Sequence, residues 1–232
     1  MVLRHGSSDT HRVSAGMDLA AEPYVQQVAQ VPARGRHILA YYDAETIVVY
    51  QAYRPSTAHY ALEHGALGGP HFSYNRMSWI KPSFLWMMYR SGWATKPGQE
   101  MVLALRLRRA FFERVLEAAV LTSFDELNYA SPAEWQRAMR TATVRVQWDP
   151  DRLPTCGRCG GRRAIQLGLR GPILEDYGRR EIVEVLDMTP FVREQRSHTV
   201  PPYANLVVPQ QRLYVPASPL ACRRVRLCES SA

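Results

Sequence analysis

The chain has 232 residues, of which 46% are hydrophobic and 22% charged, so it can bury a core and has the composition of a globular protein. No apolar run approaches the roughly 18 residues that a membrane span needs, and the N-terminus lacks the apolar core of a secretion signal. We therefore expect a cytoplasmic protein without a membrane partner.

The net charge is +8, and almost all of the positive charge comes from Arg, because Lys occurs only at positions 81 and 96. An excess of basic over acidic side chains is consistent with a solvent-exposed, positively charged surface that has no special role. It also fits an anionic partner such as nucleic acid or a nucleotide ligand, since the planar Arg fork bonds two phosphate oxygens at once.

The first half of the chain predicts several short elements. Residues 1–30 are polar and are expected to be flexible. A β-prone run covers 47–53, and a helix follows from Pro55 to a stop at Gly65. A second helix is expected to begin at Pro82 and to end at Gly92. Alternating apolar residues then predict a strand over 101–108, and residues 111–123 have the periodicity of a helix.

The second half continues the alternation of strands and helices. Strands are expected at 143–149, 164–169 and 181–189, and helices at 171–180 and 189–195, the last with Thr189 as its cap. Residues 201–232 are rich in Pro and Arg and should pack on the domain as an extension. The pattern predicts one α+β domain over 31–200, with a mixed, mainly antiparallel split β-sheet core and short flanking helices.

Cys156 and Cys159 form C-x-x-C in a Gly-rich stretch, and Cys222 and Cys228 form a looser pair near the end of the chain. The first pair resembles half of a zinc knuckle, so the two residues are weak candidates for a zinc site. Unpaired thiols in a loop are the alternative. The motifs of P-loop hydrolases, Rossmann dehydrogenases, α/β-hydrolases and zinc proteases are absent.

The stretch "RMSWIKPSFLWMMYRSGWATKPGQE", residues 76–100, combines three Trp with both Lys and with Arg90. Trp86 and Trp93 have the spacing of core residues on a helix, whereas Lys81 stands between apolar neighbours. Aromatic faces and fixed cations occur together where a planar base and its phosphates are bound, so this stretch is a candidate nucleotide site.

The segments "IVVYQAYRPSTAHYAL", "MSWIKPSFLWMMYRSGWATKPGQE", "VRVQWDP", "RAIQLGL" and "EVLDMTPFV" occur in this order. Together they closely resemble a bacterial and fungal domain family of unknown function. The pieces "VVYQAY" with "STAHYALEHG", and "IVEVLDMT", are also distantly similar to the opening and closing motifs of the ADP-ribosyltransferase superfamily.

That second resemblance implies an enzyme that uses NAD as its cofactor to modify a nucleic acid or a protein. Glu184 would be the catalytic acid, and Gln51 stands where such enzymes usually have His. The residues implied for cofactor binding are Tyr53, Arg54, Trp79, Lys81 and Arg90. We expect Gln51, Lys81 and Glu184 to line one cleft; as an alternative, Glu184 is the solvent side of an edge strand.

A second hypothesis is a protein that binds RNA or DNA, or that transfers a phosphate or nucleotide group, without NAD. The positive charge with interleaved aromatic residues favours it, since aromatic rings stack on bases and Arg follows phosphates. A third is a non-catalytic module with structural zinc.

Overall fold

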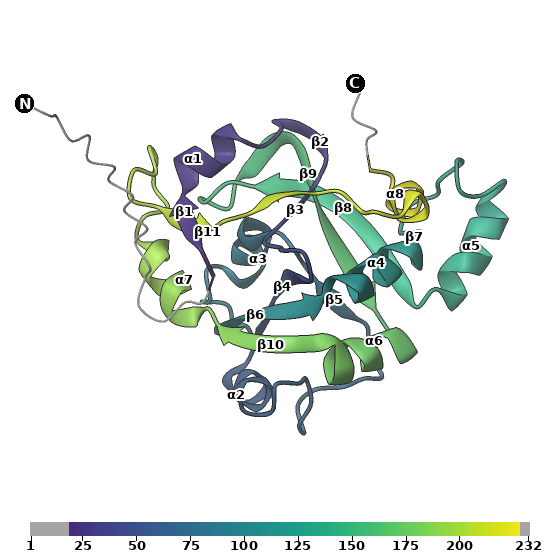
Figure 1. Ribbon diagram of the computed structural model, residues 1–232, viewed down its shortest axis with the longest axis horizontal. Helices are drawn as coiled ribbons and strands as arrows, with labels where there is room; N and C mark the ends of the chain where they lie inside the picture. Colours follow the sequence, from purple (N-terminus) through teal and green to yellow (C-terminus); the bar gives the residue numbers. More distant parts are fainter. Residues whose placement is uncertain (1–18, 228–232) are drawn as a thin grey trace, which may run out of the picture.

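Two sheets form the centre of the structure, a computed structural model that describes residues 19–227 (Figure 1). The first sheet has the order β10 (Ile182–Asp187), β6 (Met101–Arg108) and β4 (Thr46–Tyr53), with both pairs antiparallel. The second contains β2 (Arg34–Arg36), β9 (Arg158–Leu169), β8 (Val144–Arg152) and β7 (Ala119–Leu121), in that order. The predicted α+β class, with mainly antiparallel sheets, is confirmed.

The short strand β5 (Ser78–Ile80) connects the two sheets. It pairs antiparallel with β9, and directly after it Lys81 forms a β-bridge to Tyr50 of β4. The sheet therefore curls, so that residues from β4, β5, β8 and β9 approach one another although they lie far apart in the sequence.

Alternation along β4 and β6 explains why the first sheet has two buried faces. Ile47, Val49, Leu103 and Leu105 belong to a core cluster on one face, together with the inner faces of β8 and β9. Val48, Tyr50, Val102 and Ala104 belong to a second cluster on the other face, which α3 (Phe84–Ser91) and α7 (Thr189–Arg196) cover. The second cluster was not apparent from the sequence, in which only one face of β6 was expected to be apolar.

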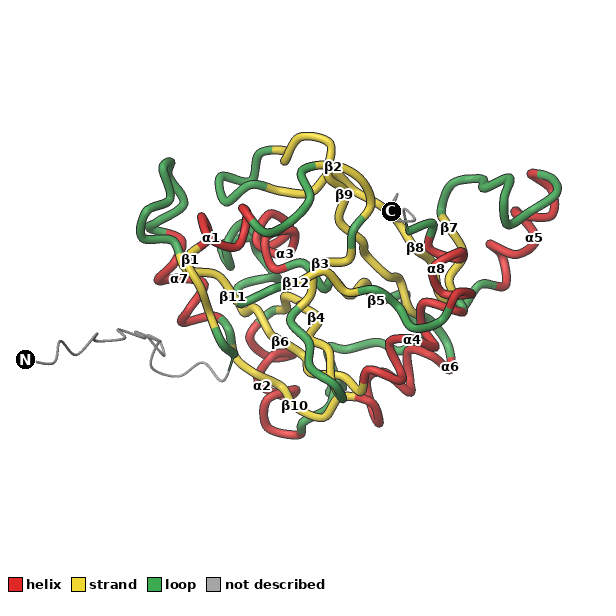
Figure 2. Tube along the Cα trace, turned by 45° about the horizontal axis from the view of Figure 1, so that its top comes forward, coloured by secondary structure: helices red, strands yellow, loops and turns green. Residues whose placement is uncertain are grey.

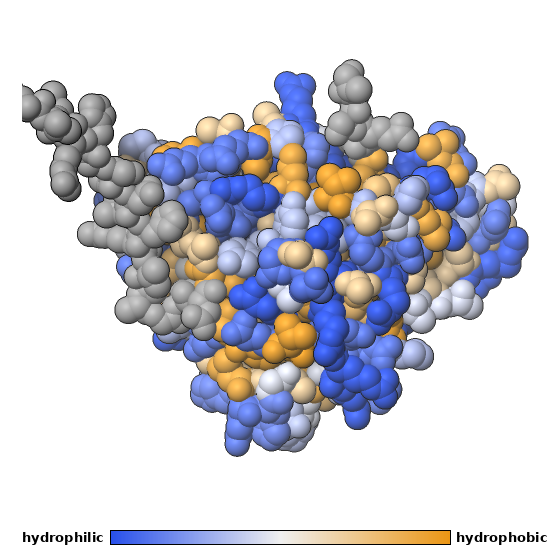
Figure 3. All heavy atoms as spheres, viewed as in Figure 1, coloured by the Kyte–Doolittle hydropathy of each residue, from blue (hydrophilic) through white to orange (hydrophobic). Residues whose placement is uncertain are grey.

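Most helices lie around the strands (Figure 2). They are α1 (Tyr24–Ala29), α2 (Pro55–His64), α3 (Phe84–Ser91), α4 (Arg109–Glu117), α5 (Pro132–Thr141), α6 (Pro172–Asp176), the π-helical turn η1 (Tyr177–Glu181), α7 (Thr189–Arg196) and α8 (Pro219–Val225). None of the helices between residues 19 and 227 is long and apolar enough to cross a membrane. On the face shown in Figure 3, hydrophilic residues cover most of the surface and apolar residues form small scattered groups.

Local signals placed the α2 and α3 boundaries well. Gly65 ends α2 in the left-handed conformation, with φ 62°. Ser83 caps α3 by accepting a hydrogen bond from the backbone N–H of Trp86, and Gly92 ends the helix at φ 60°. Trp86 and Trp93 are buried, as their helical spacing suggested.

Several boundaries differ from the expectation. The helix expected over 111–123 ends at Glu117, because residues 119–121 pair with β8 as the parallel strand β7. Thr189 does not cap α7; its hydroxyl instead accepts a hydrogen bond from the backbone N–H of Val102. The helices α5 and α8 were not predicted.

Both ends of the described chain pack on the domain. Within the segment expected to be flexible, residues 19–30 form β1 (Ala21–Pro23) and α1, and Leu19 and Tyr24 are buried; residues 1–18 lie outside the described part. The C-terminal extension supplies β11 (Val207–Pro209), which pairs with β1, and β12 (Arg212–Tyr214), which pairs with β3 (Ile38–Ala40).

Candidate functional site around Lys81

The carbonyl oxygen of Trp79, in the strand that connects the two sheets, accepts hydrogen bonds from two buried side chains. Lys81 Nζ donates to it at 2.9 Å and Gln51 Nε2 at 3.2 Å. The two residues come from β4 and from the end of β5, and the β-bridge between Tyr50 and Lys81 holds these strands together. Two of the residues predicted to form a site therefore meet at one atom.

Lys81 is only 5% exposed, and its Nζ lies 5.0 Å from the centroid of the Trp86 ring. Within residues 19–227 its amine forms no ion pair with a carboxylate. Burial and, to a smaller extent, the positive charge of Arg90 lower the pKa of Lys81 to about 7, against the opposing effect of Asp149. A substantial fraction of this amine is therefore neutral near pH 7, and a neutral amine can accept a proton or attack an electrophile.

Asp149, on β8, is the carboxylate of this site. Gln147 Nε2 donates to one of its oxygens at 2.9 Å and Gln166 Nε2 to the other at 2.6 Å. Gln147 and Gln166 are directly opposite each other on β8 and β9, on the face turned away from the core. The two amides fix the orientation of the carboxylate, because each of them donates a hydrogen bond to one of its oxygens.

Residues of α3, β5 and β8 supply positive charge and aromatic surface. Arg90, near the end of α3, is exposed, and the guanidinium of Arg152 lies 3.5 Å from the centroid of the Tyr89 ring. Trp79 points to the same face of β9 as Gln166, because both alternate with core residues. A Cβ on Gly168 would come within 3.0 Å of the Trp79 ring, so the glycine gives the indole room to lie across β9.

Gln51 has a structural role that the sequence did not reveal. Its Nε2 also donates to Ser78 Oγ at 2.8 Å, and its Oε1 accepts from the hydroxyls of Tyr53 at 2.8 Å and Tyr177 at 2.6 Å. Burial raises the pKa of both tyrosines well above their usual range, so they remain donors. All polar positions of the Gln51 amide are thus occupied by the protein itself.

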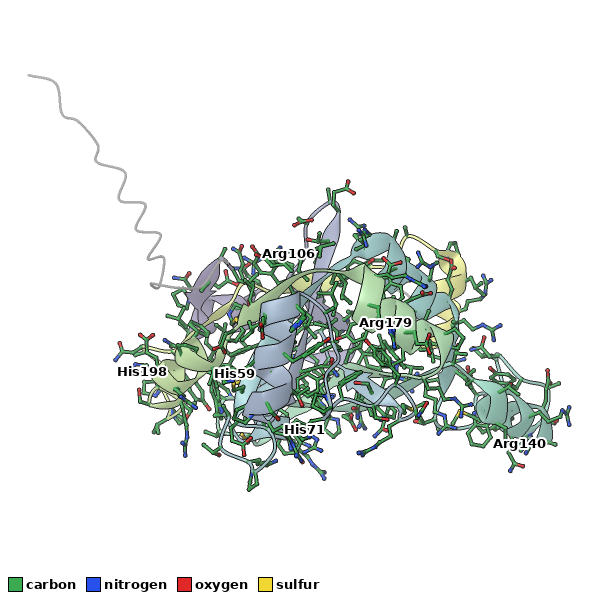
Figure 4. All side chains as sticks on the ribbon, turned by 90° about the horizontal axis from the view of Figure 1, so that it is seen from below. His59, His71, Arg106, Arg140, Arg179 and His198 are labelled. Carbon is green, nitrogen blue, oxygen red and sulfur yellow. The ribbon has the colours of Figure 1, made fainter. Side chains whose placement is uncertain are left out.

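Glu184 lies away from this site. It pairs with Arg106, whose Nε donates to its Oε2 at 2.7 Å, and Arg106 is opposite Val48 in β4. Because Val48 and Gln51 face opposite sides of β4, Glu184 and Gln51 lie on opposite faces of the first sheet (Arg106 is labelled in Figure 4). The expectation that Gln51, Lys81 and Glu184 line one cleft was therefore wrong: only the first two meet.

The remaining predicted residues are distributed as follows. Tyr53 belongs to the Gln51 network, and Arg54 is exposed at the start of α2. Cys156 and Cys159 are free thiols at the β8–β9 hairpin, and burial raises the pKa of each, which favours the protonated form. No group of three metal-binding side chains occurs between residues 19 and 227, and Cys228 lies outside that range.

The sequence contained a signal for the residues that we missed. In "VRVQWD", Gln147 and Asp149 alternate with the buried Val144 and Val146, which places them on the outer face of the strand. The sequence therefore predicts the strand and its two faces. That this outer face of β8 lies on the same side of the sheet as Trp79 depends on the pairing of β5 with β9, which the sequence does not reveal.

Comparison with known proteins gives a family but no activity. The model of a domain of unknown function, DUF4291, matches residues 37–214, which cover β3 to β12 and every residue of the site around Lys81. No curated protein matches the chain. Since the match spans well over half of the sequence, this chain belongs to the DUF4291 family.

Proposed function

We propose that this protein acts on a nucleotide or on nucleic acid without NAD, as a nucleotide-transferring enzyme with the Lys81 amine as its reacting group. The observation that carries the proposal is the position of this amine. It is buried against Trp86 and forms no ion pair within the described residues, and the charges of Asp149 and of the exposed Arg90 act on it.

The reaction that suits this arrangement is transfer of a nucleotidyl group from a nucleoside triphosphate to Nζ. The lone pair of the neutral amine attacks the α-phosphorus, and the bond from that phosphorus to the oxygen bridging to the β-phosphate breaks. Pyrophosphate leaves with the electron pair, and Lys81 retains the nucleotidyl group as a phosphoramidate. The proton lost from Nζ passes to Asp149, the nearby carboxylate.

Other side chains at the site would support this reaction. Arg90 and Arg152 supply positive charge for the phosphate oxygens, and the half-buried Trp79 offers an aromatic face to a base. A cytoplasmic location, where nucleoside triphosphates are abundant, is part of the proposal.

The test is incubation of the full chain with each nucleoside triphosphate, followed by intact mass and peptide mapping. We expect a mass gain of one nucleotidyl group, located on Lys81 and labile to acid, with release of pyrophosphate. Lys81→Met should abolish the adduct, and Lys96→Met is the matched control that should keep it. An adduct that persists in a folded Lys81→Met protein, or no adduct in the wild type, would refute the proposal.

NAD-dependent ADP-ribosyl transfer is a second candidate. One observation favours it: the Glu184 side chain is 37% exposed on the edge strand β10, so a ligand can reach it. Glu184 would then act without Gln51, from the other face of the sheet.

Thermal-shift titration with NAD tests this candidate, with nicotinamide release as the second readout. Stabilisation and turnover that are lost in Glu184→Gln but kept in Glu194→Gln, an exposed control on α7, would support it. A wild-type protein that shows neither response removes it.

A further inference from the structure

A cavity of about 970 Å³ lies at the other end of β9 from the Trp79 pairing, between β2, α8 and the loop before α5. Four arginines line it: Arg36, Arg163, Arg223 and Arg226. We call it the arginine cavity. Its volume is that of a small-molecule site, and none of the described residues that line it is acidic.

The arginine cavity is distinct from the site around Lys81. Arg163 alternates with Ala164 and lies on the same side of β9 as Ile165, which faces the core. Gln166 lies on the opposite side of the strand, next to Asp149. A ligand in the arginine cavity would therefore be separated from Lys81 by the sheet itself.

Little negative charge balances these four side chains. Within residues 19–227, Arg36, Arg163 and Arg223 form no ion pair. Arg226 has one neighbouring carboxylate, with its Nη1 3.2 Å from Asp125 Oδ1, but Asp125 is also held by the Asn128 amide. Three uncompensated guanidinium groups around one cavity favour a ligand with several anionic oxygens.

Arg226 differs from the other three arginines of the cavity. Its Nη1 is buried 3.2 Å from Asp125 Oδ1, so the charge of this guanidinium is partly balanced by the protein itself. The backbone of Arg226 is left-handed, with φ 56°, and its N–H is bonded to the carbonyls of Arg223 and Cys222, which holds the side chain at the cavity.

Part of the remaining lining is apolar, although Asn128 and Cys222 also belong to it. Leu127, Leu227, Pro216 and Pro219 form the apolar part, and Leu127 is 75% exposed. A ligand with an apolar ring beside its charged groups would cover this surface and reach the arginines at the same time.

We propose that the arginine cavity binds a nucleoside polyphosphate, with the phosphates against the four arginines and the base against Leu127 and Leu227. This site goes beyond the function proposed for Lys81 and does not depend on it. A free inorganic polyphosphate shares the same anionic chemistry, so the experiment must separate the two ligands.

Calorimetric titration of the full chain with ATP, pyrophosphate and adenosine is the test, carried out in the wild type and in Lys81→Met. We expect ATP and pyrophosphate to bind both proteins and adenosine to bind much more weakly. Replacing Arg163 and Arg223 together by Gln should weaken ATP binding by roughly ten- to a hundredfold, since two charge-assisted contacts to the phosphates are lost.

The matched control is Arg193→Gln with Arg196→Gln, which removes the same charge from α7. That helix lies near His198, at the opposite end of the molecule from Arg140 of α5, and both labelled residues can be followed in Figure 4. Leu127→Ser should weaken ATP but not pyrophosphate, whereas an equal effect on both would show that only the phosphates are recognised and would overturn the nucleoside assignment.

The site proposal fails if the wild type binds neither ATP nor pyrophosphate. It also fails if the control loses as much affinity as the Arg163 and Arg223 variant, since binding would then follow net charge alone. A further outcome is that the protein binds an RNA oligonucleotide, does not bind ATP, and keeps the RNA when ATP is added. In that case the arginines form a nucleic-acid-binding surface, and the small-molecule assignment is wrong. Loss of ATP binding in Lys81→Met alone would place the ligand at the other site.

Discussion

Gln51 and Lys81 donate to the same oxygen, the carbonyl of Trp79, although 30 positions separate them in the chain. One side chain is a neutral amide whose other positions are all occupied by Ser78, Tyr53 and Tyr177. The other is an amine without a carboxylate partner in the described residues. The same carbonyl thus joins a satisfied structural network to the buried amine of Lys81.

The first prediction concerns the protonation of Lys81. Burial beside Arg90 lowers its pKa from 10.5 to about 7, so its amine should lose its proton as the pH rises through neutrality. Because the chain has only two lysines, protein labelled with ¹³C-lysine should give two sets of side-chain signals in an NMR titration. The spectrum of Lys96→Gln shows which set of signals belongs to Lys81. A Lys81 signal that does not titrate below pH 9 would contradict the burial argument.

The second prediction is the pH dependence of stability. Since the folded pKa of Lys81 is lowered, the unfolded chain binds more protons between about pH 7 and 10.5, and the contribution of Lys81 to the unfolding free energy rises with pH across this window. Lys81→Met should therefore stabilise the fold most below pH 7, by up to about 5 kcal/mol, with the gain shrinking toward pH 10. Urea unfolding of both proteins at several pH values measures this difference in unfolding free energy. A difference that does not change with pH would show that the substitution acts through packing and not through the charge of Lys81.

The third prediction concerns Gln51. Replacing it by Leu leaves the hydroxyls of Tyr53 and Tyr177 and the Trp79 carbonyl without one partner each, in a buried region. Each lost buried partner costs about 1–3 kcal/mol, so Gln51→Leu should destabilise the domain by roughly 3 kcal/mol or more. Chemical denaturation is the measurement, with Gln147→Leu, on the half-exposed outer face of β8, as the milder control. Equal effects of the two substitutions would argue against this role.

The fourth prediction concerns the ion pair of Arg162 with Asp151, which joins the two strands of the β8–β9 hairpin. Arg162 Nε lies 2.5 Å from Asp151 Oδ2, and both side chains are almost fully buried. Removing one charge should cost about 3–5 kcal/mol, because the other is left buried and unpaired. Asp151→Asn and Arg162→Met are the single variants. The double variant should recover much of the loss in a double-mutant cycle, and strict additivity would contradict the coupling.

Local signals in the sequence were sufficient where the determinants lie within a few residues. The strand expected at 47–53, the helix ended by Gly65 and the helix ended by Gly92 follow from β-propensity and left-handed glycines, which act over one or two turns of chain. The second helix begins at Phe84 after the Ser83 cap, two residues later than the expected start at Pro82. The long motif around Lys81 also marked the segment where the amine is buried.

Tertiary structure alone decided which of the marked residues meet. The alternation along a strand defines two faces, but it does not show what covers each face. The sequence therefore could not show that Gln51 and Glu184 lie on opposite faces of the sheet, or that the charge of Asp149 acts on Lys81. The pairing of β5 with β9 brings these distant segments together, and the arginine cavity arises in the same way from β2, β9 and α8. The sequence by itself determined the net charge, the family and those elements that local signals specify, but not α1, α5, α8 or the strand β7. The placement of every charge relative to the others depended on long-range strand pairing, which is set by the packing of the whole core.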